Sequence, residues 1–164
     1  RELRDDRFQA LALIALKNAG IDATKFPDDY VRAALETCKG KFKIFSELPS
    51  YCGFYFSDEV TYPAEDVAKH FTPENKPRLQ ALRDAFWELE IFDATSLETV
   101  LKATAAELGV KVGALVHPAR LAVTGSNAGP SLYHLLEILG KRKVLARLDA
   151  ALAREWELAA GGRS

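Results

Sequence analysis

The chain contains no methionine among its 164 residues, and Arg1 already lies within a helical pattern. A chain that began at its own start codon would be expected to carry a methionine. We therefore expect the sequence to be part of a longer protein. A processed protein that is poor in methionine is the alternative.

Cysteine, long apolar runs and a leader segment are also scarce or absent. Cys38 and Cys52 are the only cysteines and form no Cys-x-x-Cys pair. This argues against a disulfide framework or a zinc site and favours a reducing compartment. No apolar run approaches the roughly 20 residues that a membrane-spanning helix needs, and no charged-then-apolar leader opens the chain. We expect a cytoplasmic protein that does not enter a membrane.

Catalytic and cofactor-binding motifs are missing too. His70, His117 and His134 are far apart in the sequence, and none lies at metal-ligand spacing from another. The chain has no Gly-x-Gly-x-x-Gly pattern and no phosphate-binding loop with lysine. Its acidic pairs stand at expected helix starts, where capping and the helix dipole account for them: Asp5-Asp6, Asp28-Asp29 and Glu65-Asp66. We therefore predict no catalytic residue, no metal and no cofactor within this chain.

The composition is that of a folded protein with an uneven charge distribution. Hydrophobic residues make up 48% and charged residues 27%, which excludes extensive disorder. Residues 110–154 hold seven basic and two acidic residues, a net charge of +5, whereas the remainder holds 15 basic and 21 acidic residues, a net charge of −6. A basic half favours contact with a polyanion. Basic helices that face only solvent are the alternative.

Apolar residues recur at helical spacing along nearly the whole chain, and no segment alternates as a strand. We predict an all-α fold of about nine helices. Residues 95–98, Thr-Ser-Leu-Glu, are typical of a capping box at a helix start. Residues 50–56 are strongly aromatic and fit either a helical turn or a strand. The predicted helices cover residues 3–19, 27–49, 63–71, 79–89, 97–108, 112–123, 131–139 and 141–160.

Two segments are candidate boundaries between parts of the chain. Residues 57–63 are the first, and residues 72–77, with two prolines in six residues, are the stronger one. We therefore predict two helical subdomains and a short tail: residues 1–71, residues 72–160 and residues 161–164. At 164 residues, the chain is long enough for two small helical groups.

The most informative stretch is 115–151. Arg120 stands alone in an apolar helical segment, where a charged side chain needs a specific partner. Its planar fork of donors matches a carboxylate, a phosphate or a base edge. The Gly125–Pro130 loop leaves the backbone open to close approach, and Tyr133 follows as an aromatic residue that can stack on a base. An ion pair inside a helical bundle is the alternative for Arg120.

This stretch resembles the C-terminal signature of glutamate–tRNA ligases, whose pattern is Pro-x-Arg-x-Ala-x-Thr-Gly, a short Gly-Pro loop, Leu-Gly-Lys and Arg-Leu. The Ala105–Gly113 lead-in and the stretches Glu47-Leu48 and Phe54–Glu59 also resemble that family, so the likeness covers residues 38–152. The matching positions are Pro118, Arg120, Ala122, Thr124, Gly125, Gly129, Pro130, Leu139, Gly140, Lys141, Arg147 and Leu148.

The resemblance implies the all-helical anticodon-binding domain of a class I aminoacyl-tRNA synthetase. It implies tRNA for glutamate as the partner, and a Rossmann catalytic domain in the same polypeptide that uses ATP and Mg²⁺. The His-Ile-Gly-His and Lys-Met-Ser-Lys-Ser type signatures of that domain are absent here. We therefore expect an inactive, monomeric piece of the ligase. Whether the parent enzyme also charges glutamine tRNA stays open.

The resemblance also implies which residues contact tRNA. It places Arg120, Gly129, Pro130 and Leu132 at the anticodon, with Tyr133 at the family's aromatic position. The family reads the third anticodon base with an arginine, where this chain has only Lys41 and Lys43 as candidates. Charge alone suggests four contacts to the tRNA backbone: Lys141, Arg142, Lys143 and Arg147. A helical protein-interaction module without RNA binding and a free-standing truncated paralogue are the alternatives.

Overall fold

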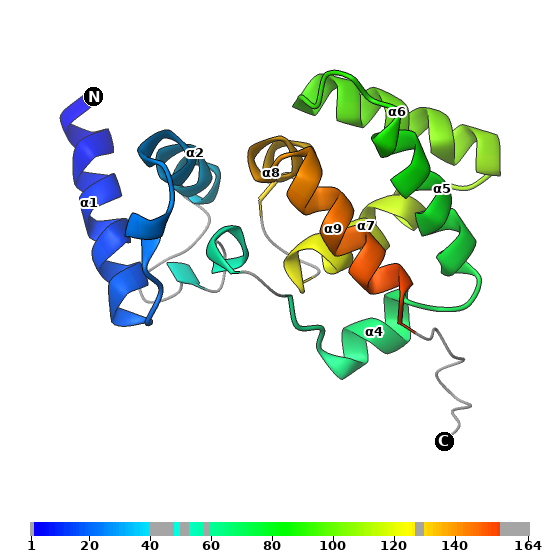
Figure 1. Ribbon diagram of the computed structural model, residues 1–164, viewed down its shortest axis with the longest axis horizontal. Helices are drawn as coiled ribbons and strands as arrows, with labels where there is room; N and C mark the ends of the chain where they lie inside the picture. The colour runs from blue at the N-terminus through cyan, green and yellow to red at the C-terminus, as the bar shows by residue number, and fades with distance from the viewer. Residues whose placement is uncertain (1, 40–47, 50–52, 58–59, 127–129, 155–164) are drawn as a thin grey trace. The chain divides into compact units, whose positions relative to one another are not determined.

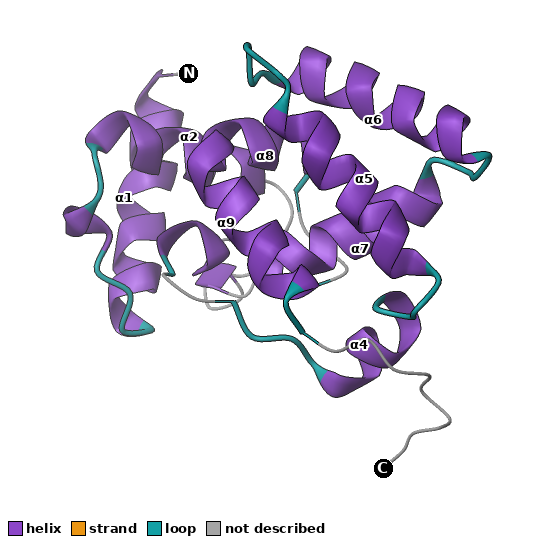
Figure 2. Ribbon diagram, turned by 45° about the vertical axis from the view of Figure 1, so that its right-hand side comes forward, coloured by secondary structure: helices purple, strands orange, loops and turns teal. Residues whose placement is uncertain are grey.

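The computed structural model describes residues 2–39, 48–49, 53–57, 60–126 and 130–154. Every regular element in these ranges is a helix, which confirms the all-α prediction (Figures 1 and 2). No helix in this part of the chain has the length and apolarity that crossing a bilayer demands. The elements are α1 (Glu2–Asn18), η1 (Ala23–Lys25), α2 (Asp28–Cys38), η3 (Gly53–Phe56), α4 (Ala64–His70), α5 (Asn75–Trp87), α6 (Ala94–Leu108), α7 (Gly113–Thr124), α8 (Leu132–Leu139) and α9 (Lys141–Leu152).

The chain forms two compact units. Arg1–Asp58 with Ala128–Ser131 make the first, and Glu59–Asn127 with Leu132–Ser164 make the second. The division therefore falls in the earlier of the two boundary candidates, whereas the sequence favours 72–77. The reason is tertiary, because α4 packs against α7 and so joins the second unit.

The first unit is built on α1 and α2. Their facing sides bury small and branched residues, and the buried Gln9 side-chain amide donates to the Arg32 carbonyl oxygen (3.3 Å) and to the Glu36 carboxylate (3.1 Å). The aromatic stretch forms the 3₁₀ turn η3, which settles the choice between a turn and a strand at Gly53–Phe56. Tyr55 of this turn shares a hydrogen bond of 2.7 Å with the Thr37 hydroxyl of α2.

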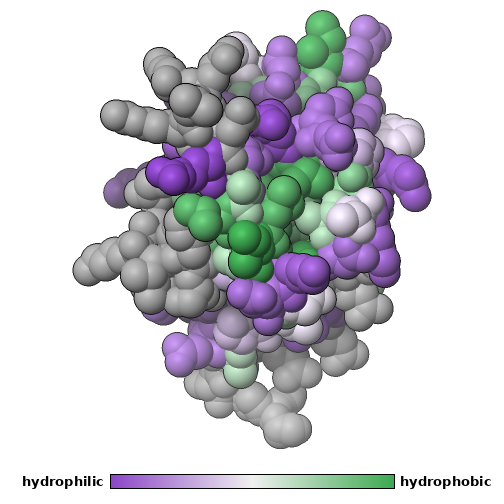
Figure 3. Space-filling view, turned by 90° about the vertical axis from the view of Figure 1, so that its left-hand side faces the viewer, coloured by the Kyte–Doolittle hydropathy of each residue, from purple (hydrophilic) through white to green (hydrophobic). Residues whose placement is uncertain are grey.

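One face of α1 remains apolar and exposed. Ile14 is 54% exposed, and Leu11 and Leu13 beside it are each 42% exposed. Leu13 and Ile14, together with the turn after α1, border an open groove of about 610 Å³. Figure 3, which looks at this side, shows an apolar patch with polar residues above it, below it and to its right.

The second unit is a bundle in which α5, α7, α8 and α9 pack around a leucine-rich core and α6 covers α5 and α8. α7 runs as one helix through Pro118. The buried side chains at its centre come from every long helix: Leu79, Leu82, Phe86, Leu97, Leu101, Leu115, Ala119, Leu121, Leu135, Leu136, Val144 and Leu148.

Two helix ends differ from the prediction. The capping box at Thr95 is wrong, because Asp93 caps α6 by accepting the Ser96 backbone N–H (2.8 Å). A hydrogen bond from the Ser96 side chain and then this backbone hydrogen bond lower the pKa of the Asp93 carboxyl. The helix predicted over 27–49 ends at Cys38, with Lys39 as its C-terminal cap; residues 40–47 lie outside the described ranges.

Candidate nucleic-acid interface

Arg120 lies on α7, four residues before the end of the helix. Its side chain is half-buried, and burial lowers the pKa of the guanidinium from its ordinary value. Arginine nevertheless keeps its charge in proteins. A cation held part-way out of water on a packed helix is pre-organised to recognise an acceptor, because it loses less hydration and less side-chain entropy on binding.

The carbonyl groups at the C-terminal end of α7 are capped one after another. The last four carbonyls of a helix have no partner within the helix itself. Here the Leu121 carbonyl oxygen accepts the Gly125 backbone N–H (2.8 Å), and the Ala122 carbonyl oxygen accepts the Tyr62 hydroxyl (2.9 Å). The Val123 carbonyl oxygen accepts Nη1 of Arg147 (2.8 Å) from α9. Side chains from two other segments therefore hold this helix end in place.

The chain leaves α7 through Gly125, and this position accepts no other residue without strain. Its φ of +79° lies in the left-handed region, and a Cβ there would collide with the Thr61 carbonyl oxygen. Just before it, the Thr124 hydroxyl donates to the Arg120 carbonyl oxygen (2.8 Å) and accepts the Ser126 N–H (3.1 Å). Thr124 and Gly125, which match the Thr-Gly of the family pattern, thus end the helix with a fixed backbone conformation.

The residues that the resemblance places at the anticodon are not equally accessible. Gly129 lies outside the described residues. Pro130 is buried, and the Leu132 side chain is only 3% exposed, so it belongs to the bundle core. Tyr133 is half-buried; its pKa is raised by burial first and then by the nearby charge of Glu98 on α6. Among the described members of this set, Arg120 and Tyr133 have side chains that reach solvent.

The basic cluster separates into inward and outward side chains. Arg147 is 6% exposed, and Lys141 donates from Nζ to the Trp87 and Leu89 carbonyl oxygens, each at 2.7 Å. Both therefore act within the fold, and we do not retain them as contacts to the tRNA backbone. Arg142 is exposed and Lys143 half-buried, so these two remain candidates. Lys41 and Lys43 lie outside the described residues.

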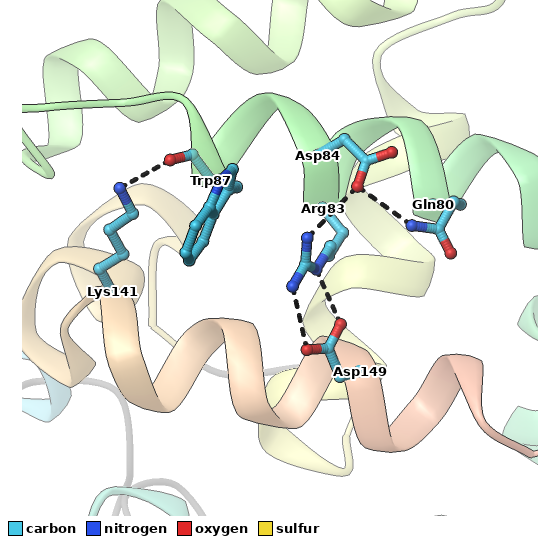
Figure 4. A network of polar contacts seen from close by, with 6 residues as sticks. All are labelled: Gln80, Arg83, Asp84, Trp87, Lys141 and Asp149. Carbon is cyan, nitrogen blue, oxygen red and sulfur yellow. Dashed lines mark hydrogen bonds and ion pairs between the residues drawn. The ribbon is translucent and has the colours of Figure 1, made fainter.

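Lys141 is one of several polar residues that join α5 and α9 at their surface (Figure 4). Arg83 of α5 makes a two-pronged contact with Asp149 of α9, with Nε–Oδ1 at 2.8 Å and Nη2–Oδ2 at 3.2 Å. The Trp87 ring lies between Arg83 and Lys141, whose charged groups are 5.6 Å and 5.4 Å from the ring centroid. The two cations thus hold α5 against α9.

Comparison with known proteins identifies a family for most of the chain. The family model described as the anticodon binding domain matches residues 7–152.

The chain belongs to the anticodon-binding domain family.

Similar proteins include glutamate–tRNA ligases. The one from Moorella thermoacetica is 34% identical over 155 residues, which make up 92% of this chain and 32% of that ligase. Glutamate–tRNA ligase 2 from Caldicellulosiruptor saccharolyticus is 32% identical over 79% of this chain and 27% of its own length. The chain therefore spans roughly a third or less of the curated relatives that it matches.

Solved structures share the fold. The glutamate tRNA ligase from Elizabethkingia meningosepticum, in complex with its amino acid, matches with a TM-score of 0.77 at 20% identity, over 90% of this chain and 29% of that one. The glutamate-tRNA synthetase from Elizabethkingia anophelis matches with a TM-score of 0.73 at 18% identity, over 92% and 28%. The two-unit helical architecture is thus one that larger proteins also contain.

The sequence gives no signal for two residues that organise this anticodon-binding domain. Tyr62 lies before α4 in what reads as a boundary segment, yet its hydroxyl caps α7. Trp87 is 57% exposed and belongs to no motif in the sequence, yet it lies between two cations. Both roles depend on contacts between segments more than 50 residues apart.

Metal-ligating side chains do not gather in the described part of this domain. No group of three or more histidine, cysteine, aspartate or glutamate residues there is placed to hold a metal ion. His70 of α4 and His117 of α7 stack with ring centroids 5.5 Å apart. Burial and then the charge of His117 lower the pKa of His70. The pair therefore acts as a contact between two helices.

Proposed function

We propose that this chain binds the anticodon end of the tRNA for glutamate, as the anticodon-binding part of a longer glutamate–tRNA ligase. The observation that carries the proposal is Arg120, a half-buried cation on a helix whose end is fixed by three capped carbonyls. The family membership and the ligases among its relatives support it. A planar guanidinium held in this way can make paired hydrogen bonds to a base edge.

The division of labour in the intact ligase follows from the chemistry of the residues present. This domain supplies a cation near the loop that the resemblance places at the anticodon, together with Arg142 and Lys143 for the phosphate backbone. Glutamate activation with ATP and Mg²⁺ belongs to a Rossmann catalytic domain in the same polypeptide. We expect the chain by itself to act as a monomer in the cytoplasm and to catalyse no glutamate-dependent pyrophosphate exchange.

A binding experiment with two RNAs tests the role of Arg120. Stem-loops with the cognate anticodon and with a changed anticodon are titrated against the wild type, Arg120→Ala and the control Arg142→Ala. Arg120→Ala is expected to lose roughly 1–3 kcal/mol of discrimination, as for other paired base contacts. Arg142→Ala is expected to weaken both RNAs about equally, because a phosphate contact carries no sequence information.

Thermal melting of each variant separates recognition from folding. If Arg120 is only a structural ion pair, its removal lowers the melting temperature and weakens both RNAs alike, and the base-reading role fails. If the wild type binds neither RNA, the proposed function itself fails and a protein-interaction module becomes the better hypothesis.

A further inference from the structure

The clamp on the end of α7 consists of the Tyr62 hydroxyl on the Ala122 carbonyl and the Arg147 guanidinium on the Val123 carbonyl. Both clamp residues are distant in sequence from the helix that they hold, by 60 residues for Tyr62 and by 24 for Arg147. Both lie, with α7, in the second compact unit.

We propose that Arg147 and Tyr62 are positioning residues for anticodon recognition, which fix the direction in which α7 presents Arg120 and releases the following loop. The proposal rests on the proposed function, because it assigns the clamp to the same site. Arg147 is one of the positions that resemble the ligase family. The proposal gives it a positioning role, whereas its charge alone suggests a contact with the tRNA backbone.

Burial makes the Arg147 contact specific. A cation only 6% exposed needs a defined acceptor, since burying an unpaired charge is costly. The C-terminal end of a helix carries partial negative charge and open carbonyls, so it stabilises a cation placed there. The 2.8 Å bond from Nη1 to the Val123 carbonyl oxygen places Arg147 at that end. Filling the same volume with an apolar side chain would leave this carbonyl uncapped.

Two neighbouring side chains hold the Tyr62 ring in place. The Phe71 ring meets its ring edge-on at 5.2 Å between centroids, and the Arg154 guanidinium lies 5.2 Å from the ring centroid. Burial is the main cause that raises the pKa of Tyr62 above its ordinary value, so the hydroxyl stays protonated and can donate. The Ala122 carbonyl oxygen therefore has a donor with little freedom to move.

The clamp is linked to Arg120 through the backbone of the last turn of α7. Thr124, which directly follows the clamped residues, donates its hydroxyl to the Arg120 carbonyl oxygen and accepts the Ser126 N–H. Arg120 lies four residues before Thr124, roughly 6 Å of rise along the helix. A shift of the clamped carbonyls would therefore move both the cation and the first residues of the loop, and a misplaced fork makes fewer paired hydrogen bonds.

The test measures anticodon preference and affinity separately. Arg147→Met keeps most of the buried volume but removes the charge and the donors, whereas Arg147→Lys keeps the charge and one donating group. Arg142→Ala is the matched control, because it also removes an arginine from α9 but an exposed one. Each is titrated with the cognate and the changed-anticodon stem-loops, at a temperature where melting curves show every variant to be folded.

We expect Arg147→Met to reduce the preference for the cognate stem-loop by about tenfold, within the range of a lost paired base contact. We expect Arg147→Lys to recover part of that preference, and Arg142→Ala to keep the wild-type preference while binding both RNAs more weakly. Where Arg147→Met does not fold, Tyr62→Phe takes its place, since it removes one hydroxyl and keeps the ring packing.

Two outcomes are distinguishable. A wild type that shows no preference between the RNAs defeats the proposed function, and the clamp proposal with it. If the wild type discriminates between the RNAs and folded Arg147→Met, or Tyr62→Phe in its place, keeps the full preference, only the clamp proposal is overturned. A variant that melts at a lower temperature but keeps the wild-type preference also overturns the clamp proposal, because a purely structural contact would give that result.

Discussion

At the scale of single residues, two glycines that end helices share a backbone conformation but differ in how closely another segment approaches them. Gly109 ends α6 at φ +71° and Gly125 ends α7 at φ +79°, both in the left-handed region. A Cβ at Gly109 would meet open space, whereas a Cβ at Gly125 would collide with the Thr61 backbone and crowd Val60. Conformation alone requires glycine at the first position, and close approach of another segment adds to that requirement at the second.

We expect Gly109→Ala to lower the free energy of unfolding by about 1–2 kcal/mol, the cost of a left-handed L-residue. Gly125→Ala should cost roughly a further 1–3 kcal/mol, because the neighbouring backbone must move as well. Urea denaturation of the two variants measures the difference. Equal losses in the two proteins would show that the segment at Thr61 gives way without cost.

At the scale of elements, the bundle uses cations from one helix to close the end of another. Lys141, the first residue of α9, lies at the end of α5 and binds the Trp87 and Leu89 carbonyl oxygens. Positive charge at a helix C-terminus is favourable, and the side chain gains two acceptors there. The start of α9 is thereby tied to the last turn of α5.

Lys141→Ala is expected to lower the free energy of unfolding by about 1 kcal/mol through loss of this cap. Arg142→Ala, one residue along and exposed, should change it by less than about 0.5 kcal/mol. Thermal melting gives the stability of each variant. A larger loss from Arg142→Ala than from Lys141→Ala would contradict the assignment of the inward and outward cations.

The contact between α4 and α7 should weaken in mild acid. Burial and then the charge of His117 lower the pKa of His70, with Asp66 raising it and Lys69 lowering it to smaller extents. As the pH falls, His70 in the unfolded chain therefore binds a proton before His70 in the folded chain does. The stabilisation is fully present above the ordinary histidine pKa and is lost as the pH falls towards the lowered pKa of the folded state.

We expect wild-type melting temperature to fall between about pH 7.5 and about pH 5.5 by more than that of His70→Gln, which lacks this proton uptake. His117→Gln, which removes the neighbouring ring and leaves the burial, should lie between the two. Melting curves at both pH values for the three proteins measure the effect. A larger acid-induced fall in His70→Gln than in the wild type would reverse the sign and reject the explanation.

At the scale of the whole molecule, the charge available for RNA is smaller than the sequence suggests. The C-terminal part carries a net charge of +5 over residues 110–154, but Lys141 and Arg147 point into the fold. Arg120, Arg142 and Lys143 remain as the described candidates for contact with RNA under the proposed function. Recognition by this domain should therefore depend on a few placed contacts and not on a broad basic surface.

Binding of the chain to tRNA is expected to be weak and to fall with salt. Each phosphate contact contributes about −0.7 to −0.9 to the slope of log affinity against log salt, so two or three contacts give a slope of about −2. Titrations across a range of salt concentrations measure it. A slope near zero would deny the phosphate contacts, and one several times steeper would mean that cations outside the described residues take part.

The sequence by itself determined the helical class, the main helix stops and the family. Apolar residues at helical spacing are a local pattern, and glycines at 20, 109, 125 and 140 end helices through their own backbone freedom. The spacing of the residues from Pro118 to Leu148 likewise carries the family likeness without any structure. Such features depend on neighbours within a few residues, so the linear order of the chain is enough.

Only the tertiary structure decided which charged and polar side chains serve the fold and which face solvent. Arg147 and Arg142 look alike in the sequence, yet one is buried against α7 and the other is exposed. The start of α6 is another case, because the Ala94 N–H donates to the Glu137 carboxylate of α8 (3.1 Å), outside the reach of a local capping pattern. A long polar side chain takes the acceptor that packing brings near it, and packing joins segments that are distant in the chain.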